Sequence, residues 1–368
     1  MRTFARIHRS LLQQNFENIR QAVGPKAAIL AVVKADAYGH GAVEVARALA
    51  AVGAGHFAVA CLEEAVALRS AGIEGEVLIL GGLEPGQEPA AREHRLTPVI
   101  HTRCQLQDWQ TQAAAAQQQL PCHIEVDTGM NRLGMLISSV DDLAGLLREA
   151  SSLRLEGIAT HLASADDFAD DQTNQQRERF DALIAALRES GIQPRYIHQS
   201  NSAAVAYRPA MDLTMVRPGL AIYGYVSASS GPAPASRLQV RPVLEWKTRI
   251  HSIKDVAAGS RLGYYGAYRA ERPLRAAVLP VGYGDGLNRR MSEGGEVVVR
   301  GTRCPILGLL SMDLTTIDLS RVPEAAVGDE VTLIGPTIDA RVMAERCGTI
   351  VYETLCGISK RVPRIYGD

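Results

Sequence analysis

Eight short apolar segments in the first part of the chain constrain its fold more than any other feature. Each is typical of a β-strand, and they are residues 28–34, 56–60, 76–80, 96–100, 123–127, 155–161, 195–200 and 213–219. Between most of them lie amphipathic, alanine-rich stretches that favour helices, such as 41–53, 62–71 and 171–189. Strands that alternate with helices predict a parallel sheet, and eight such units predict a (β/α)8 barrel of the TIM type. On pattern alone, an open doubly wound sheet is the alternative.

The pattern changes after the last of these segments. Residues 226–237 are rich in Ser, Ala, Pro and Gly and are typical of a linker. After it, β-type runs dominate, for example at 243–253, 275–283, 295–301 and 329–335, and only 337–347 looks helical. At 368 residues the chain exceeds the usual size of one core. We therefore expect an α/β protein with a barrel over 8–231 and a mostly-β domain over 232–368, with residues 1–7 pairing with the second.

Charge and cysteine placement exclude several classes of function. The 39 basic and 40 acidic residues give a net charge of −1, so the chain has no overall field to hold nucleic acid or an anionic membrane. No apolar run is long enough to cross a bilayer, and the N-terminus lacks a signal-peptide core. The six cysteines form no C-x-x-C pair, and the nine histidines no H-E-x-x-H motif. We expect a cytoplasmic protein without a metal.

The segment AVVKADAYGHG, residues 31–41, is the strongest candidate for chemistry. Lys34 stands at the carboxyl end of an apolar strand and is followed by a loop that contains glycine. Barrel active sites lie at that end of the strands, and a lysine that is partly desolvated there becomes a usable nucleophile or base. A strand-end lysine that points to solvent is the equal alternative on spacing alone.

Nine motifs in order resemble those of the alanine racemases, the fold-III enzymes that use pyridoxal 5′-phosphate (PLP). They are AVVKADAYGHG, VDTGMNRLG, ATHLASAD, HQSNSAA, VRPGLAIYG, RLGYYGAY, PVGYGDG, SMD and ISKRVPR, and they extend over nearly the whole chain. The resemblance implies a PLP-binding barrel followed by a β domain. It also implies interconversion of L- and D-alanine by two bases, in a role of D-alanine supply for peptidoglycan or of alanine catabolism.

The resemblance implies a set of cofactor-binding residues. Lys34 matches the lysine that forms the internal Schiff base and then acts as the base on one face of the α-carbon. Arg217 matches the arginine at the pyridine nitrogen, which it can hydrogen-bond without readily giving up a proton. His161 matches the histidine over the ring, and the phosphate-contacting positions match Tyr38, Ser202, Gly219 and Leu220. The plainer alternatives are a packed core tyrosine at 38, a helix cap at Ser202 and a structural histidine at 161. His198 and Asn201 are expected to support the site.

The remaining site residues fall in two further groups. Tyr264 matches the base on the opposite face, although Tyr265 beside it leaves the register open. In the family this tyrosine reaches the site from the other subunit, which implies a homodimer with shared sites. Arg132 and the backbone of Met312 match groups that bind the substrate carboxylate, and Tyr283 matches a tyrosine at the entrance.

Two positions depart from the family pattern. Many members carry a carbamylated lysine seven residues before the arginine, where this chain has Glu125. We hypothesise that Glu125 or a bound anion takes its place, against the alternative of a glutamate that is paired elsewhere. Lys360 replaces a tyrosine of some members, so the choice between alanine and other amino acids stays open.

Other activities to consider are a serine or broad-specificity racemase, a PLP-binding protein without catalysis, and a decarboxylase of the same fold. The decarboxylases share the plan of a barrel plus a β domain but do not carry this set of motifs. The related PLP-binding proteins without catalysis end near the barrel and lack a β domain. Here residues 238–368 carry Tyr264, Tyr283 and Met312, which disfavours a pure binding module.

Overall fold

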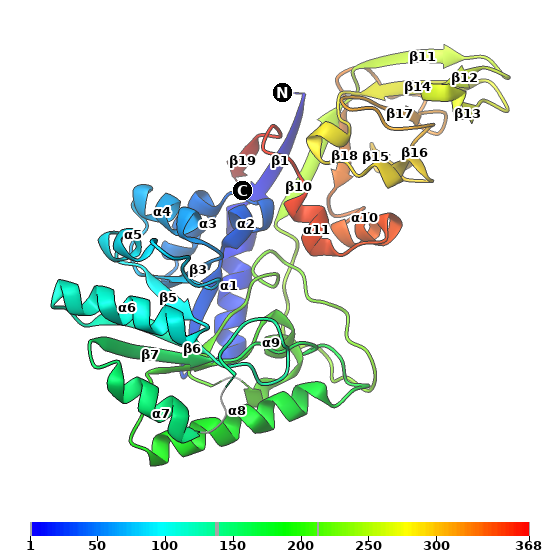
Figure 1. The fold of residues 1–368 in the computed structure, drawn as a ribbon. Helices are drawn as coiled ribbons and strands as arrows, with labels where there is room; N and C mark the ends of the chain where they lie inside the picture. The colour runs from blue at the N-terminus through cyan, green and yellow to red at the C-terminus, as the bar shows by residue number, and fades with distance from the viewer. Residues whose placement is uncertain (1, 137–139, 212, 368) are drawn as a thin grey trace. The chain divides into compact units, whose positions relative to one another are not determined.

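The computed structural model describes residues 2–136, 140–211 and 213–367 and divides the chain into two compact units. The barrel unit comprises Leu12–Ala37 and Ala42–Arg241, and the C-terminal unit comprises Met1–Leu11, Tyr38–Gly41 and Pro242–Asp368. Figure 1 shows the barrel unit mainly in blue to green and the C-terminal unit mainly in yellow to red.

Eight parallel strands form the barrel unit, in the order β8-β7-β6-β5-β4-β3-β2-β9. They are β2 (Ala28–Val32), β3 (His56–Val59), β4 (Glu76–Ile79), β5 (Thr97–Ile100), β6 (Leu120–Glu125), β7 (Leu153–Ala159), β8 (Tyr196–His198) and β9 (Met215–Val216). Beyond β8 and β9, a parallel bridge joins Asn201 to Arg217, and the Arg217 N–H donates to the Ser200 carbonyl at 2.8 Å. These contacts join the two ends of the sheet, which confirms the predicted barrel.

Helices alternate with these strands in chain order (Figure 1). They are α1 (Arg9–Val23), α3 (Ala42–Ala50), α4 (Leu62–Ser70), α5 (Glu88–Glu93), α6 (Arg103–Ala116), α7 (Val140–Glu149), α8 (Gln172–Glu189) and α9 (Ser202–Tyr207), with a 3-10 turn η1 (Pro209–Met211). Helix α8 buries Phe180, Leu183 and Leu187, which follow helical spacing, and this apolar face holds it against the barrel.

The segment after β2 differs from the expected loop. It is one helical turn, α2 (Lys34–Gly39), and the residues Ala35 to Tyr38 have φ between 52° and 54°. These angles are those of a left-handed helix, which costs an L-residue roughly 1–2 kcal/mol each. The surrounding structure must therefore compensate for this strain, which lies directly after Lys34 in the chain.

The C-terminal unit contains a six-stranded, a three-stranded and a two-stranded sheet. The first has the order β16-β15-β18-β10-β1-β19, the second β11-β14-β17 and the third β12-β13. The strands are β1 (Thr3–His8), β10 (Leu244–Arg249), β11 (Ser252–Val256), β12 (Arg261–Leu262), β13 (Tyr268–Arg269), β14 (Leu274–Leu279), β15 (Glu296–Val299), β16 (Thr302–Pro305), β17 (Thr315–Asp318), β18 (Glu330–Ile334) and β19 (Arg364–Gly367). Strand β1 lies between β10, antiparallel to it, and β19, parallel to it.

Two details of the C-terminal unit differ from the sequence prediction. The run 243–253 forms two strands in different sheets, β10 and β11, rather than one. Besides α10 (Ala340–Cys347) there is a second helix, α11 (Val351–Cys356). The sequence did not predict α11, because six residues are too few to show a helical repeat of apolar positions. The unit also contains the 3-10 turns η2 (Tyr264–Gly266), η3 (Tyr283–Asp285) and η4 (Arg289–Ser292). Among the described residues, no helix combines the length and hydropathy needed to cross a membrane.

Candidate active site

Arg217 follows strand β9 and lies at the centre of a buried hydrogen-bond network. One terminal nitrogen donates to the His198 Nδ1 at 2.8 Å and to the His198 carbonyl at 2.9 Å. The other donates to the Thr160 carbonyl at 2.9 Å and lies 3.2 Å from the His161 Nδ1. Burial lowers the pKa of Arg217, yet an arginine remains protonated in proteins. The guanidinium is therefore a fixed cation within the barrel.

The network continues from Arg217 through two fully buried histidines. Arginine can only donate, so the Nδ1 of His198 must accept and its proton must lie on Nε2. That Nε2 donates to the Nδ1 of His123 at 2.8 Å, which places the His123 proton on its own Nε2. This atom faces Glu76 at 3.6 Å, near the start of strand β4. Burial, followed by the charge of Arg217, holds the pKa of His198 well below its usual value, so the ring stays neutral.

His161 is neutral for a similar reason. Burial, with the charges of Arg217, Arg132 and Lys34, lowers the pKa of His161 to about 3. Its Nδ1 faces the Arg217 donor, so its proton lies on Nε2. His161 follows strand β7, and its ring is a neutral, flat surface beside the Arg217 cation.

Ser202 links the ends of strands β8 and β9. Its hydroxyl oxygen accepts from the N–H groups of Gly219 at 2.9 Å and of Ala221 at 3.1 Å, so its own proton can donate elsewhere. Asn201, not Ser202, caps helix α9, because its side chain accepts from Ala203 and Ala204, each at 3.1 Å. The helix-cap alternative for Ser202 is therefore wrong.

The left-handed turn that begins with Lys34 is held by two carboxylates. Glu64 accepts from the Ala35 N–H at 2.7 Å with one oxygen and from the Ala60 N–H at 2.8 Å with the other. Asp36 accepts from the Ala42 N–H at 2.8 Å. These bonds fix the chain where Lys34 leaves strand β2. Sequence reasoning missed Glu64, because its distance along the chain gives no signal of this contact.

Glu125 is the last residue of strand β6, and Arg132 lies in the loop that follows this strand. Asp127 organises this loop by accepting from three consecutive N–H groups, of Gly129, Met130 and Asn131, at 2.8, 3.0 and 3.1 Å. The Arg132 side chain is exposed and Glu125 is half-buried. Within the described ranges, no ion pair joins these two side chains.

The candidate residues of the C-terminal unit are mostly exposed. Tyr264 is 63% exposed, Met312 53% and Tyr283 43%. Tyr265, in the same turn, is 91% exposed and has a left-handed φ of 59°. Tyr38 differs, because it is buried and packs against Tyr352 with ring centroids 5.7 Å apart. Burial raises the pKa of Tyr38, so its hydroxyl stays protonated.

Comparison with known proteins places this arrangement. The family description "Alanine racemase, N-terminal domain" matches residues 7–227, and "Alanine racemase, C-terminal domain" matches 243–366. The chain belongs to the alanine racemase family. A relative from Geobacter sulfurreducens named alanine racemase is 38% identical over 99% of this chain and 97% of its own length. Its name denotes an isomerase.

Solved structures of alanine racemases agree with this membership. That of Clostridium difficile 630 in complex with cycloserine has a TM-score of 0.92 and 32% identity, and the match covers 100% of this chain and 96% of the other. That of Bartonella henselae, which has covalently bound pyridoxal phosphate, has a TM-score of 0.90 and 28% identity, with 100% and 99% covered.

The residues of the barrel unit fit a pyridoxal phosphate cofactor. Lys34 supplies a primary amine, the donor-only Arg217 suits a ring nitrogen that accepts, and Ser202 offers a hydroxyl proton. The Leu220 N–H has no acceptor among the described residues and can serve a phosphate oxygen. In the described part of the chain, no cluster of three or more His, Cys, Asp or Glu side chains could hold a metal ion.

Proposed function

We propose that the chain interconverts L- and D-alanine with PLP, and that Lys34 and Tyr264 are its two bases. The observation that carries the proposal is the network in which Arg217, His198, His161 and Ser202 surround the carboxyl ends of the strands beside Lys34. The cofactor, when bound, acidifies the α-proton of the amino acid. Lys34, Ser202, Leu220 and Arg217 would hold it, with His161 against its ring and Tyr38 near its phosphate. Gly219, whose N–H donates to the Ser202 hydroxyl, would hold it through that serine.

Arg217 suits racemisation for an electrostatic reason. A pyridine nitrogen that receives a hydrogen bond but no proton is a weaker electron sink, which limits side reactions such as transamination. The relay through His198 and His123 keeps every ring proton directed away from Arg217, so neither histidine can take over its donor role. The Lys34 Nζ removes or returns the proton on one face and the Tyr264 hydroxyl acts on the other.

The exposure of the C-terminal residues supports a homodimer with shared sites. A free tyrosine has a pKa near 10, so Tyr264 needs cationic or hydrogen-bonding neighbours to act as a base. At 63% exposure, most of the Tyr264 side chain is in contact with solvent. A second copy that covers Tyr264, Tyr283 and Met312 would supply such neighbours, and would bring the two bases to one site.

Arg132 is proposed to bind the substrate carboxylate together with the Met312 N–H. Glu125 or a bound anion would orient Arg132 in place of a carbamylated lysine, which makes activity independent of bicarbonate. Removing CO2 and restoring bicarbonate tests this, because a carbamate would be lost and regained. The role in D-alanine supply or alanine catabolism and the cytoplasmic location belong to the same proposal. The scattered cysteines, none of which is in a disulfide, suit a reducing compartment.

The proposal is tested by NMR with PLP-loaded protein and L-alanine in D2O. Deuterium at the α-carbon that appears together with D-alanine is the expected result. Exchange without inversion would mean that Lys34 acts and Tyr264 does not. The absence of both would refute racemisation of alanine. A second candidate, a racemase that also takes serine, rests on Lys360, and L-serine in the same assay decides it.

A further inference from the structure

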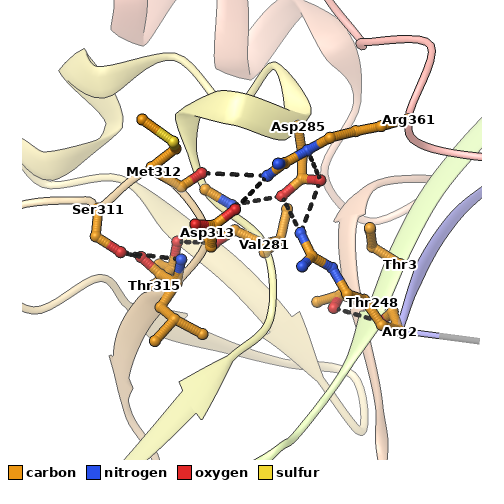
Figure 2. Close-up of polar contacts among 12 residues, drawn as sticks. Arg2, Thr3, Thr248, Val281, Asp285, Ser311, Met312, Asp313, Thr315 and Arg361 are labelled. Carbon is orange, nitrogen blue, oxygen red and sulfur yellow. Dashed lines mark hydrogen bonds and ion pairs between the residues drawn. The ribbon is translucent and has the colours of Figure 1, made fainter.

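A buried carboxylate in the C-terminal unit joins several distant segments. Asp285 is 1% exposed and accepts four hydrogen bonds. Arg2 donates to both of its oxygens at 3.0 Å, and the Arg361 Nε donates to one of them at 2.8 Å (Figure 2). The Gly282 N–H donates to the other oxygen at 2.9 Å. Charge-assisted bonds of this kind are about twice as strong as neutral ones. Asp285 therefore fixes the turn η3 that carries Tyr283.

The turn η3 also holds the segment that contains Met312. The Tyr283 N–H donates to the Ser311 carbonyl at 3.1 Å, and the Gly284 N–H donates to the Met312 carbonyl at 2.9 Å. A Cβ at Gly282 would lie 2.3 Å from the Ser311 oxygen, so only glycine permits this approach.

The direction of the Met312 N–H follows from this contact. In a planar trans peptide the N–H points opposite to the C=O. Because the Ser311 carbonyl is bonded toward the turn, the N–H of Met312 points away from it. That N–H has no acceptor within the described ranges, and the side chain beside it is 53% exposed. It is a donor held in one direction and available to a ligand.

Arg361 fixes the other side of the same segment. One terminal nitrogen donates to Asp313 at 2.7 Å and lies 3.4 Å from the Met312 carbonyl, as Figure 2 shows. Arg361 thus spans Asp285 and Asp313, the residue after Met312. Asp285 is buried, whereas Arg361 is partly exposed, and the contacts named here all lie within the C-terminal unit.

We propose that Asp285, with Arg361, is a positioning residue that sets the direction of the Met312 N–H for a substrate carboxylate. The inference rests on the proposed function, in which Met312 binds that carboxylate. It gives the segment G-Y-G-D-G, residues 282–286, a positioning role in addition to that of Tyr283. The aspartate fixes the turn, the glycines admit the neighbouring backbone, and the donor is oriented before substrate arrives.

The test compares Asp285→Asn and Arg361→Lys with the control Asp329→Asn in the PLP-loaded protein. Asp329 also accepts from an arginine, Arg300, and from a backbone N–H, that of Ala326, but it touches neither segment. Two quantities are measured. One is the KM and kcat for alanine, and the other is the Kd for propionate by calorimetry, since propionate has the carboxylate without the amine.

We expect KM and the propionate Kd to rise together by about tenfold in both variants, with kcat changed less than about threefold, because one charge-supported contact is weakened. PLP affinity stays unchanged. A loss of kcat with KM and propionate Kd unchanged would indicate only fewer folded molecules and would overturn the proposal. If Asp285→Asn does not fold, Arg361→Lys still tests the proposal. Wild-type protein that binds propionate without racemising alanine would refute the proposed function while leaving the calorimetric comparison valid.

Discussion

The barrel unit and the C-terminal unit present their candidate residues in opposite ways. In the barrel unit, Arg217 and His198 are buried and hydrogen-bonded to each other. In the C-terminal unit, Tyr264 and Met312 are more than half exposed, although the backbone beneath Met312 is firmly bonded. The candidate cofactor-binding residues of the barrel unit are therefore held in place by buried contacts. The candidate residues of the C-terminal unit instead leave much of their side chains in contact with solvent.

This difference separates two kinds of substitution. A change in the barrel unit is expected to alter cofactor binding and folding stability. A change at the exposed residues of the C-terminal unit is expected to leave both intact and to alter catalysis alone.

Lys34→Ala should abolish racemisation, by about 10⁴-fold or more, because both the cofactor linkage and one base are lost. The visible absorbance of the bound cofactor should change as well. Lys26→Ala, at an exposed lysine, is the matched control. Steady-state rates and absorbance spectra measure both effects. Near-normal racemisation by Lys34→Ala would exclude the proposed chemistry.

Tyr264→Phe should lower racemisation by about a hundredfold or more while PLP affinity stays unchanged, because one proton-transfer group is removed from an exposed turn. Exchange of the α-proton in D2O from the Lys34 side should persist. Tyr265→Phe is the control and also settles the register between the two tyrosines. A larger effect at Tyr265 than at Tyr264 would show that the assignment is shifted by one residue.

His123→Leu should destabilise the barrel unit by about 1–3 kcal/mol, because the His198 Nε2–H would be buried without an acceptor. His123→Asn is the matched variant, since its side-chain oxygen can accept in place of Nδ1, and it should lose less. Urea unfolding measures both. Equal losses in the two variants would argue that packing against Gly157, which lies under the His123 ring, matters more than the relay.

Stability should fall as the pH drops from about 6.5 toward 3. His161 has a folded pKa of about 3 against an ordinary 6.5, so in this range the unfolded chain binds a proton that the folded chain does not. The free energy of unfolding then rises with pH, by at most about 1.4 kcal/mol per unit for one proton, and is fully retained above 6.5. His161→Asn should flatten this slope, whereas His251→Asn, at an exposed histidine, should not. An unchanged slope in His161→Asn would contradict a neutral, buried imidazole.

Local sequence was sufficient to predict the barrel strands and to identify the family resemblance. All eight barrel strands lie within or overlap the apolar segments predicted for them, because burial on both faces leaves a continuous apolar run. Helix α11 was missed, since six residues are too few to show a helical period. The left-handed turn after Lys34 was missed because nothing in A-D-A-Y favours positive φ.

The sequence by itself determined the barrel strands, the order of the motifs and the residue types that the chemistry needs, because these depend on periodicity and on side-chain identity. Only the tertiary structure decided which groups meet. His123 and Glu76 join Arg217 through contacts between residues far apart in the chain, and Asp285 meets Arg2 across 283 positions. Hydrogen-bond partners are selected by the closing of the barrel and the pairing of strands. No local pattern encodes those distances.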